Sequence, residues 1–139
     1  HGAVVTYYVE ANFDDGAVSK SNFFTVTAEN DAPVANPDPT VPLDPAYTIK
    51  AGQLLTVAAR GVLINDTDSD SPVASLTAVL VSGPPTAATA QFQLNANGSF
   101  TFKSINGFKG TVQFTYLAKD VTPVSARNIP VTVTINVGK

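Results

Sequence analysis

The chain has 139 residues and a net charge of −3, with 8 Lys plus Arg, 11 Asp plus Glu and no Cys. The basic residues are scattered singly, so there is no basic stripe for nucleic acid, and the missing Cys excludes disulfides, thiolate metal sites and thiol nucleophiles. The apolar runs are short and interrupted by Thr, Ser or Pro, so we expect no membrane insertion.

Runs of β-type sequence recur along the whole chain, separated by turn signals rich in Gly, Pro, Asn and Asp. The expected strands are, in chain order, residues 3–11, 22–28, 47–50, 54–58, 75–82, 90–94, 99–103, 111–118 and 129–137. This spacing is typical of an all-β sandwich or barrel. Helix is expected only as a single turn at residues 61–64.

The clearest hairpin lies at residues 91–102, where two alternating segments flank Asn97-Gly98. Both of these turn residues are expected at positive φ, as a tight hairpin turn requires. The alternation of the flanking segments predicts four side chains that face the core, namely Phe92, Leu94, Phe100 and Phe102.

An internal repeat indicates the domain organisation. Residues 2–9 (GAVVTYYV) correspond to residues 110–117 (GTVQFTYL) at a constant offset of 108, which matches Tyr8 with Tyr116. In sandwiches such a tyrosine often uses its hydroxyl to hold a neighbouring connection. A period of this length suits a string of sandwich domains. We therefore assign residues 1–30 to the closing hairpin of a preceding repeat, 31–38 to a linker and 39–139 to a complete immunoglobulin-like sandwich.

A hairpin that is surplus to the sandwich needs a partner, because an isolated pair of strands is marginally stable and exposes its edges. Either an adjoining repeat in a longer polypeptide covers it, or a neighbouring copy does so by strand addition. Its aromatic residues are expected in the core of the truncated domain or, alternatively, in the contact surface of a polymer. These residues are Tyr7, Phe13, Phe23 and Phe24.

Alternating carboxylates form a candidate site for a hard cation, because an extended loop projects them to one side and calcium prefers oxygen ligands. In the expected sandwich this loop lies at the end facing the preceding domain, near the linker and the closing turn. The candidate ligands are Asp66, Asp68, Asp70, Asp31, Glu29 and Asp120. Calcium would relieve their mutual repulsion and fix the angle between domains. Alternatively, these residues are turn formers whose side chains cap backbone amides.

Four segments in a fixed order resemble the bacterial cadherin-like and immunoglobulin-like tandem repeats of large extracellular adhesins and surface proteins. They are residues 30–35 (NDAPVA), 61–68 (GVLINDTD), 94–102 (LNANGSFTF) and 108–116 (FKGTVQFTY). The resemblance implies a Greek-key sandwich in a tandem array, an adhesive or spacer role and calcium at domain junctions. Residues 119–124 (KDVTPV) and 68–72 (DSDSP) depart from the acidic, glycine-containing turns of these repeats.

These observations favour a non-catalytic structural or adhesive module at the cell surface. Enzyme activity is not expected, because the carboxylates lie on turns without an implied cleft. Two alternatives remain: a subunit of an extracellular filament assembled by strand addition through residues 1–30, and a carbohydrate-binding accessory domain, which the absence of Trp disfavours. The expected partners are adjoining repeats or neighbouring copies, together with a surface ligand that the sequence does not identify.

Overall fold

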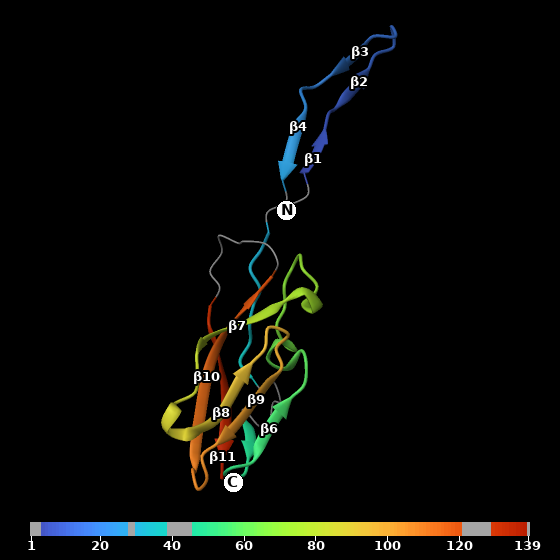
Figure 1. Cartoon of the computed structure of the whole chain (residues 1–139). Coiled ribbons are helices and arrows are strands. Elements are labelled where there is room, and N and C mark those ends of the chain that lie inside the picture. Colours follow the sequence, from blue (N-terminus) through green and yellow to red (C-terminus); the bar gives the residue numbers. More distant parts are fainter. Residues whose placement is uncertain (1–3, 28–29, 39–45, 121–128, 139) are drawn as a thin grey trace. The chain divides into compact units, whose positions relative to one another are not determined.

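The computed structural model describes residues 4–27, 30–38, 46–120 and 129–138. The chain divides into two compact units, unit 1 at His1–Asn30 and unit 2 at Asp31–Lys139. The regular structure of the described residues consists mainly of strands (Figure 1). Their helical segments are short 3₁₀ turns, η1 (Gly61–Leu63), η2 (Val73–Ser75) and η3 (Thr86–Ala88). The all-β class and the turn expected at residues 61–64 are therefore confirmed.

Unit 1 is a long hairpin made of two short antiparallel ladders. β1 (Val4–Tyr7) pairs with β4 (Phe24–Thr27), and β2 (Glu10–Asn12) pairs with β3 (Val18–Lys20). Between the ladders, the Val9 N–H donates to Ser21 Oγ at 2.9 Å and the Ser21 N–H donates to Val9 O at 2.8 Å. The strand expected at residues 3–11 is thus interrupted where a serine side chain replaces a backbone acceptor.

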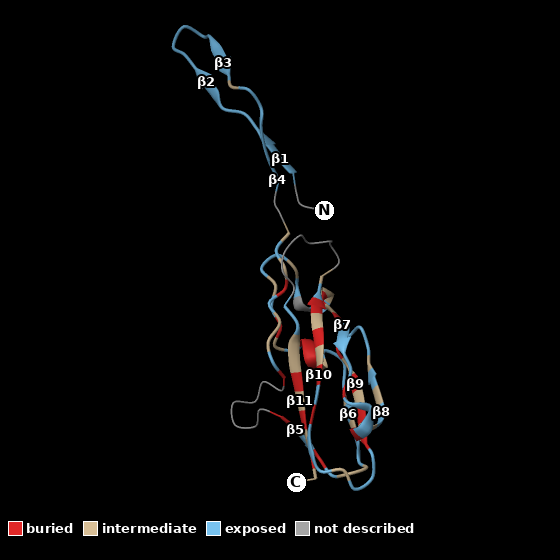
Figure 2. Ribbon diagram, turned by 90° about the vertical axis from the view of Figure 1, so that its left-hand side faces the viewer, coloured by how far each residue is buried: buried red, intermediate tan, exposed pale blue. Residues whose placement is uncertain are grey.

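Unit 2 is a sandwich of two sheets, with strand orders β5-β11-β10-β7 and β6-β9-β8. The strands are β5 (Tyr47–Ile49), β6 (Leu54–Val57), β7 (Thr77–Ser82), β8 (Thr89–Leu94), β9 (Phe100–Ser104), β10 (Gly110–Lys119) and β11 (Val131–Val137). Neighbours are antiparallel except β5, which runs parallel to β11. Figure 2 shows the two sheets facing each other with buried residues between them. This is the predicted immunoglobulin-like Greek-key arrangement.

The core of unit 2 follows from strict alternation along its central strands. β10 buries Val112, Phe114, Tyr116 and Ala118, and it turns the intervening residues outward. The Phe114 ring packs against Phe100 at 5.2 Å and Phe92 at 4.8 Å between ring centroids. Of the four core residues predicted in the hairpin, Phe100 and Phe102 are fully buried, while Phe92 and Leu94 are half-buried against the core. The predicted face is therefore confirmed.

The β8–β9 hairpin closes with a three-residue loop that differs from the expected turn. The Asn95 N–H donates to Ser99 O and the Gly98 N–H donates to Asn95 O, and Gly98 has φ +81°. The prediction of positive φ at Asn97 is wrong, because in this loop a type I turn precedes a single left-handed residue. Unit 1 uses the same design at Phe13 to Ala17, with Gly16 at φ +82°.

The segment at residues 31–38, predicted to be a linker, forms part of the sandwich. Val34 pairs with Thr67, and Asp38 pairs in parallel with Val133 on β11. Asn65 adds side-chain hydrogen bonds, since its Nδ2 donates to the carbonyl oxygens of residues 36 and 37. Unit 2 accordingly begins at Asp31. The segment packs because it supplies backbone partners to the first half of β11, which β5 does not pair.

Candidate functional site

Three carboxylates meet at the end of unit 2 where β10 ends. Asp68 and Asp70 lie in the loop between η1 and η2, and Asp120 follows β10 directly. One carboxylate oxygen from each residue lies within 4.8 Å of the other two. The fold thus brings together three of the six predicted ligands, although Asp120 is far from the others in the chain.

Asp68 divides its two oxygens between different surroundings. Its Oδ1 atom accepts hydrogen bonds from the backbone N–H groups of Asp70 and Ser71, at 3.1 and 3.0 Å. This is the amide capping that the alternative interpretation of the loop predicts. Its Oδ2 atom is buried and has no hydrogen-bond donor within the described part of the chain. One oxygen therefore shapes the loop, and the other is an unsatisfied acceptor beside the cluster.

Asp31 lies against the same cluster from the start of unit 2. Its backbone N–H donates to Asp70 Oδ2 at 3.0 Å, and its own Oδ2 accepts from Ser69 Oγ at 2.7 Å. An open hollow beside these contacts is lined by Asp31, Ala32, Val34, Thr67, Asp68 and Ser69. The cluster therefore couples the loop to the first residue of the sandwich.

The two neighbouring carboxylates of the loop respond differently to their surroundings. Desolvation raises the pKa of Asp68, and the nearby charge of Asp70 adds to that rise. The backbone N–H of Asp31 lowers the pKa of Asp70, because it donates to the charged form. Asp68 is thus the member of the pair whose negative charge is disfavoured, and an oxygen-seeking cation would relieve that cost.

Asp66 was predicted as a ligand, but the structure places it away from this cluster. It is 1 % exposed, its Oδ1 accepts from the Asn36 N–H at 2.9 Å, and its Oδ2 lies 2.9 Å from Tyr116 Oη. The expectation assumed an extended loop, whereas Thr67 pairs with Val34 and residues 68–71 form a turn. Alternation therefore fails after Asp66. Glu29, the remaining candidate, lies outside the described residues.

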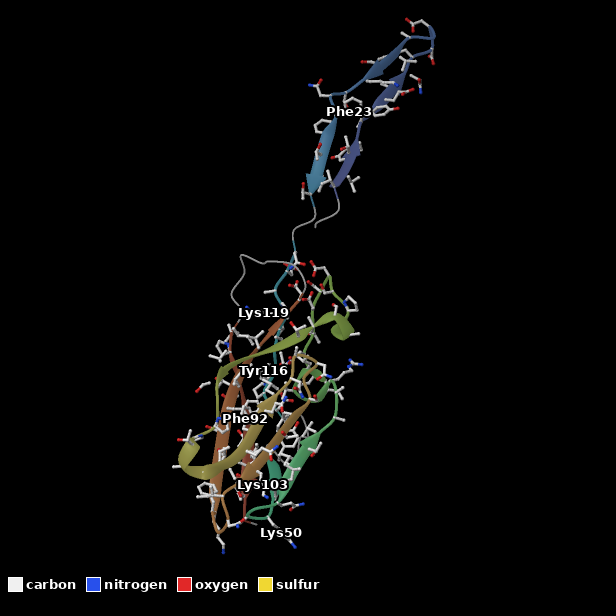
Figure 3. All side chains as sticks on the ribbon, viewed as in Figure 1. Phe23, Lys50, Phe92, Lys103, Tyr116 and Lys119 are labelled. Atoms are coloured by element: carbon white, nitrogen blue, oxygen red, sulfur yellow. The ribbon has the colours of Figure 1, made fainter. Side chains whose placement is uncertain are left out.

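Tyr116 is the centre of a second, buried cluster (Figure 3). Its hydroxyl lies within hydrogen-bond distance of Val62 O, Asp66 Oδ2 and Asp38 Oδ2. A hydroxyl carries one proton, so it satisfies only one of these three acceptors as a donor. The predicted role of Tyr116, to hold neighbouring connections in place, is confirmed by these contacts.

Asp38 is the member of this cluster that the sequence did not reveal. It is 2 % exposed, and burial, together with the charge of Asp66, raises its pKa to about 7 against the opposing hydrogen bond from Tyr116. When protonated, Asp38 donates to Tyr116 Oη and leaves the tyrosine proton for Asp66 or Val62. The single signal in the sequence was indirect: a buried tyrosine hydroxyl needs a polar partner.

The comparisons with known proteins concern unit 2. The family model of the bacterial cadherin-like domain matches residues 30–137. No curated protein and no solved structure matches the chain. Within the described residues, no helix has the length and apolar character needed to cross a membrane.

Proposed function

The chain belongs to the bacterial cadherin-like domain family, and from this membership we propose that it is a spacer module of a repetitive extracellular surface protein, stiffened by calcium. The cadherin-like domain is a non-catalytic, adhesion-type fold that is typically found at the cell surface. Membership of this family supports a general role as a structural or adhesive module. The calcium site, the array and the spacer role are our proposal.

The observation that carries the calcium proposal is the convergence of Asp68, Asp70 and Asp120 within 4.8 Å. These residues fit calcium because they offer carboxylate oxygens, and Asp68 Oδ2 is buried without a donor among the described residues. Asp31 is a further candidate through its position beside the loop. Asp66 is not included, because Tyr116 and Asn36 already engage both of its oxygens.

The chain's own residues define what an ion would stabilise. Asp120 directly follows the end of β10, and Asp68 and Asp70 belong to a loop whose Asp70 side chain accepts a hydrogen bond from the Asp31 N–H. When bound, calcium would supply positive charge that replaces repulsion between these carboxylates with attraction. A loop, the end of a strand and the first residue of the sandwich would then be held together, as a spacer under tension requires.

Calcium titration of the whole chain tests this proposal. We expect isothermal titration calorimetry to detect calcium binding and the melting temperature of unit 2 to rise with calcium, by mass action on the folded state. Asp70→Asn should weaken both effects, whereas Asp15→Asn, an exposed carboxylate in the turn of unit 1, should leave both unchanged. Equal melting temperatures in calcium and in chelator would refute the calcium site.

Small-angle scattering tests whether stiffening extends beyond unit 2. We expect the chain to sample a narrower range of maximum dimensions in calcium than in chelator. Asp31 is the first residue of unit 2, so an ion held beside it would restrict the motion of the chain at residues 30 and 31. Scattering curves that do not change on chelation would limit the role of the ion to the interior of unit 2.

A further inference from the structure

Unit 1 presents an apolar face that none of its described residues covers. The pairing of β1 with β4 places Val5 opposite Val26 and Tyr7 opposite Phe24. The Tyr7 and Phe24 rings stack at 5.6 Å, and all four side chains remain between 47 % and 58 % exposed. We call this set of four residues the Tyr7 face.

The opposite side of the same ladder has a different character. Because neighbours along a strand alternate, it carries Val4 and three threonines, Thr6, Thr25 and Thr27. Tyr8 and Phe23 lie beyond this ladder and pack edge to face on each other at 5.6 Å, and Figure 3 labels Phe23 on the ribbon. Lys20 covers the Tyr8 ring at 4.8 Å, so that pair is partly satisfied within unit 1.

The closing strands of unit 2 show the same division between faces. Val112 and Phe114 on β10 are buried opposite Ile135 and Val133 on β11. The outward side of this pair carries threonines and Gln113. In unit 2 the buried side is covered by the β6-β9-β8 sheet, while β7 and β5 flank the pair. The Tyr7 face corresponds in character to this covered side.

If the Tyr7 face is the inner side, the register of the internal repeat shifts by one residue along β1. At an offset of 108, Thr6 would take the position of Phe114 and a threonine would enter the core. The ladder groups Val5 and Tyr7 on one side with Val26 and Phe24, and with this side inward Val5 takes the position of Val112 and Tyr7 that of Phe114. With Val5 at the position of Val112, the pairing places Val26 at the position of Ile135 and Phe24 at that of Val133, so both strands present the same inner side.

We propose that the Tyr7 face closes the core of a cadherin-like partner consisting of strands equivalent to β5 through β9 and lacking its own β10 and β11. A second copy of this chain fits less well, because its unit 2 already holds β10 and β11 between β5 and β7. The proposal rests on the tandem array proposed above. It does not involve calcium, so the two ideas fail separately.

A lengthened chain tests the proposal directly. A second copy of residues 31–109 is placed ahead of Ala3, so that Val5 occupies the position of Val112, and amide hydrogen exchange is followed at residues 4–27. In the 139-residue chain we expect rapid exchange there, since two strands alone are marginally stable. In the lengthened chain we expect exchange to slow by a factor of at least about 100, as in the core of a folded domain.

Paired substitutions identify the face that makes the contact. In the lengthened chain, Tyr7→Ser with Phe24→Ser should abolish the slowed exchange, because both rings point from the Tyr7 face. The matched variant, Thr6→Ser with Thr25→Ser, changes the opposite side and should retain the slowed exchange. Loss of slowed exchange in the threonine variant alone would overturn the assignment of the inner face.

Three results would overturn the proposal as a whole. The first is rapid exchange at residues 4–27 in the lengthened chain, including the case in which the added strands stay unfolded while unit 2 folds. The second is slow exchange in a monomeric 139-residue chain, which would make the hairpin self-sufficient. The third is slow exchange in a 139-residue chain that sedimentation velocity shows to be dimeric or larger, which would make a second copy the partner. All samples are measured with and without calcium.

Discussion

The hydroxyl of Tyr116 on β10 lies 2.9 Å from Asp66 Oδ2, although the two residues are 50 positions apart in the chain. The same hydroxyl lies 3.2 Å from Asp38 Oδ2, in the segment that enters the sandwich. One side chain therefore joins the central strand, the acidic loop and the entering segment. The acidic motif is therefore divided, since Asp66 supports the interior while Asp68 and Asp70 lie in the carboxylate cluster with Asp120.

Tyr116→Phe should destabilise unit 2 by about 1–3 kcal/mol, because it leaves buried acceptors without their donor. Urea unfolding followed by circular dichroism measures the change. Tyr7→Phe makes the same chemical change on the exposed hairpin and should leave the unfolding of unit 2 within about 0.5 kcal/mol of the parent. An equal, small effect of both substitutions would mean that the Tyr116 hydroxyl contributes no net stability.

The stability of unit 2 should fall as the pH rises from about 4 to about 7. The pKa of Asp38 is raised from 3.8 to about 7 in the folded state, so the native protein binds the proton more tightly than the unfolded chain. Its stabilising contribution is complete below the unfolded pKa and is lost as the pH passes through the folded pKa. One such group changes the free energy of unfolding by at most about 1.4 kcal/mol per pH unit.

Asp38→Asn isolates this contribution, because the amide retains the shape and a donor toward Tyr116 but does not titrate. Urea unfolding between pH 4 and pH 8 should therefore give a flatter pH dependence for the variant than for the parent. Asp66, whose pKa is also raised by burial, remains in both proteins, so the difference between the two curves reports the titration of Asp38 together with its interaction with Asp66. Parallel curves for the two proteins would exclude Asp38 as the titrating group.

Asp68→Asn should raise the melting temperature of unit 2 without calcium and reduce the further rise that calcium produces. Without calcium, the melting temperature should rise, because the charged form of Asp68 is disfavoured and an amide oxygen still caps the N–H groups of Asp70 and Ser71. With calcium, the variant should gain less stability than the parent, because one carboxylate ligand is gone. Scanning calorimetry in calcium and in chelator measures both effects, and a shift of the same sign and size in both would contradict the site.

Gly98→Ala should destabilise unit 2 by roughly 1–3 kcal/mol through two combined effects. The residue has φ +81°, and an added Cβ would lie 3.0 Å from Arg60 O and from Leu63 Cγ. Gly107→Ala separates these effects, because Gly107 has φ +77° but open space around the added atom. Its cost should be smaller, and chemical denaturation of both variants tests the ranking.

Much of the fold was predictable because the central strands alternate regularly. In β10 each second residue is buried, and the Phe100 to Phe102 repeat in β9 points inward as expected. The entering segment at residues 31–38 was not predictable, because it lacks alternation and is held by isolated pairs and by Asn65. Periodicity predicts strands that have a buried face, and this segment makes its contacts largely through the backbone.

The candidate site was predictable only in part. Asp68, Asp70 and Asp120 come together because the sandwich joins the loop to the end of β10, a relationship that the expected topology contained. The separation of Asp66 from them depends on the pairing of Thr67 with Val34 and on the turn that the Asp68 side chain closes, because both interrupt the expected alternation of side chains. The role of Asp38 depends on a tertiary contact with Tyr116, and no local pattern announces such a contact.

The parallel pairing of β5 with β11 has a mechanical consequence. Tyr47 pairs with Ile135 and Ile49 with Val137, so the first strand and the last strand of the sandwich run side by side in the same direction. A pull on the two ends of unit 2 draws these strands past each other lengthwise. Their hydrogen bonds then share the force and break together rather than one after another, so the sandwich resists stretching at the place where tension along the chain would enter and leave it.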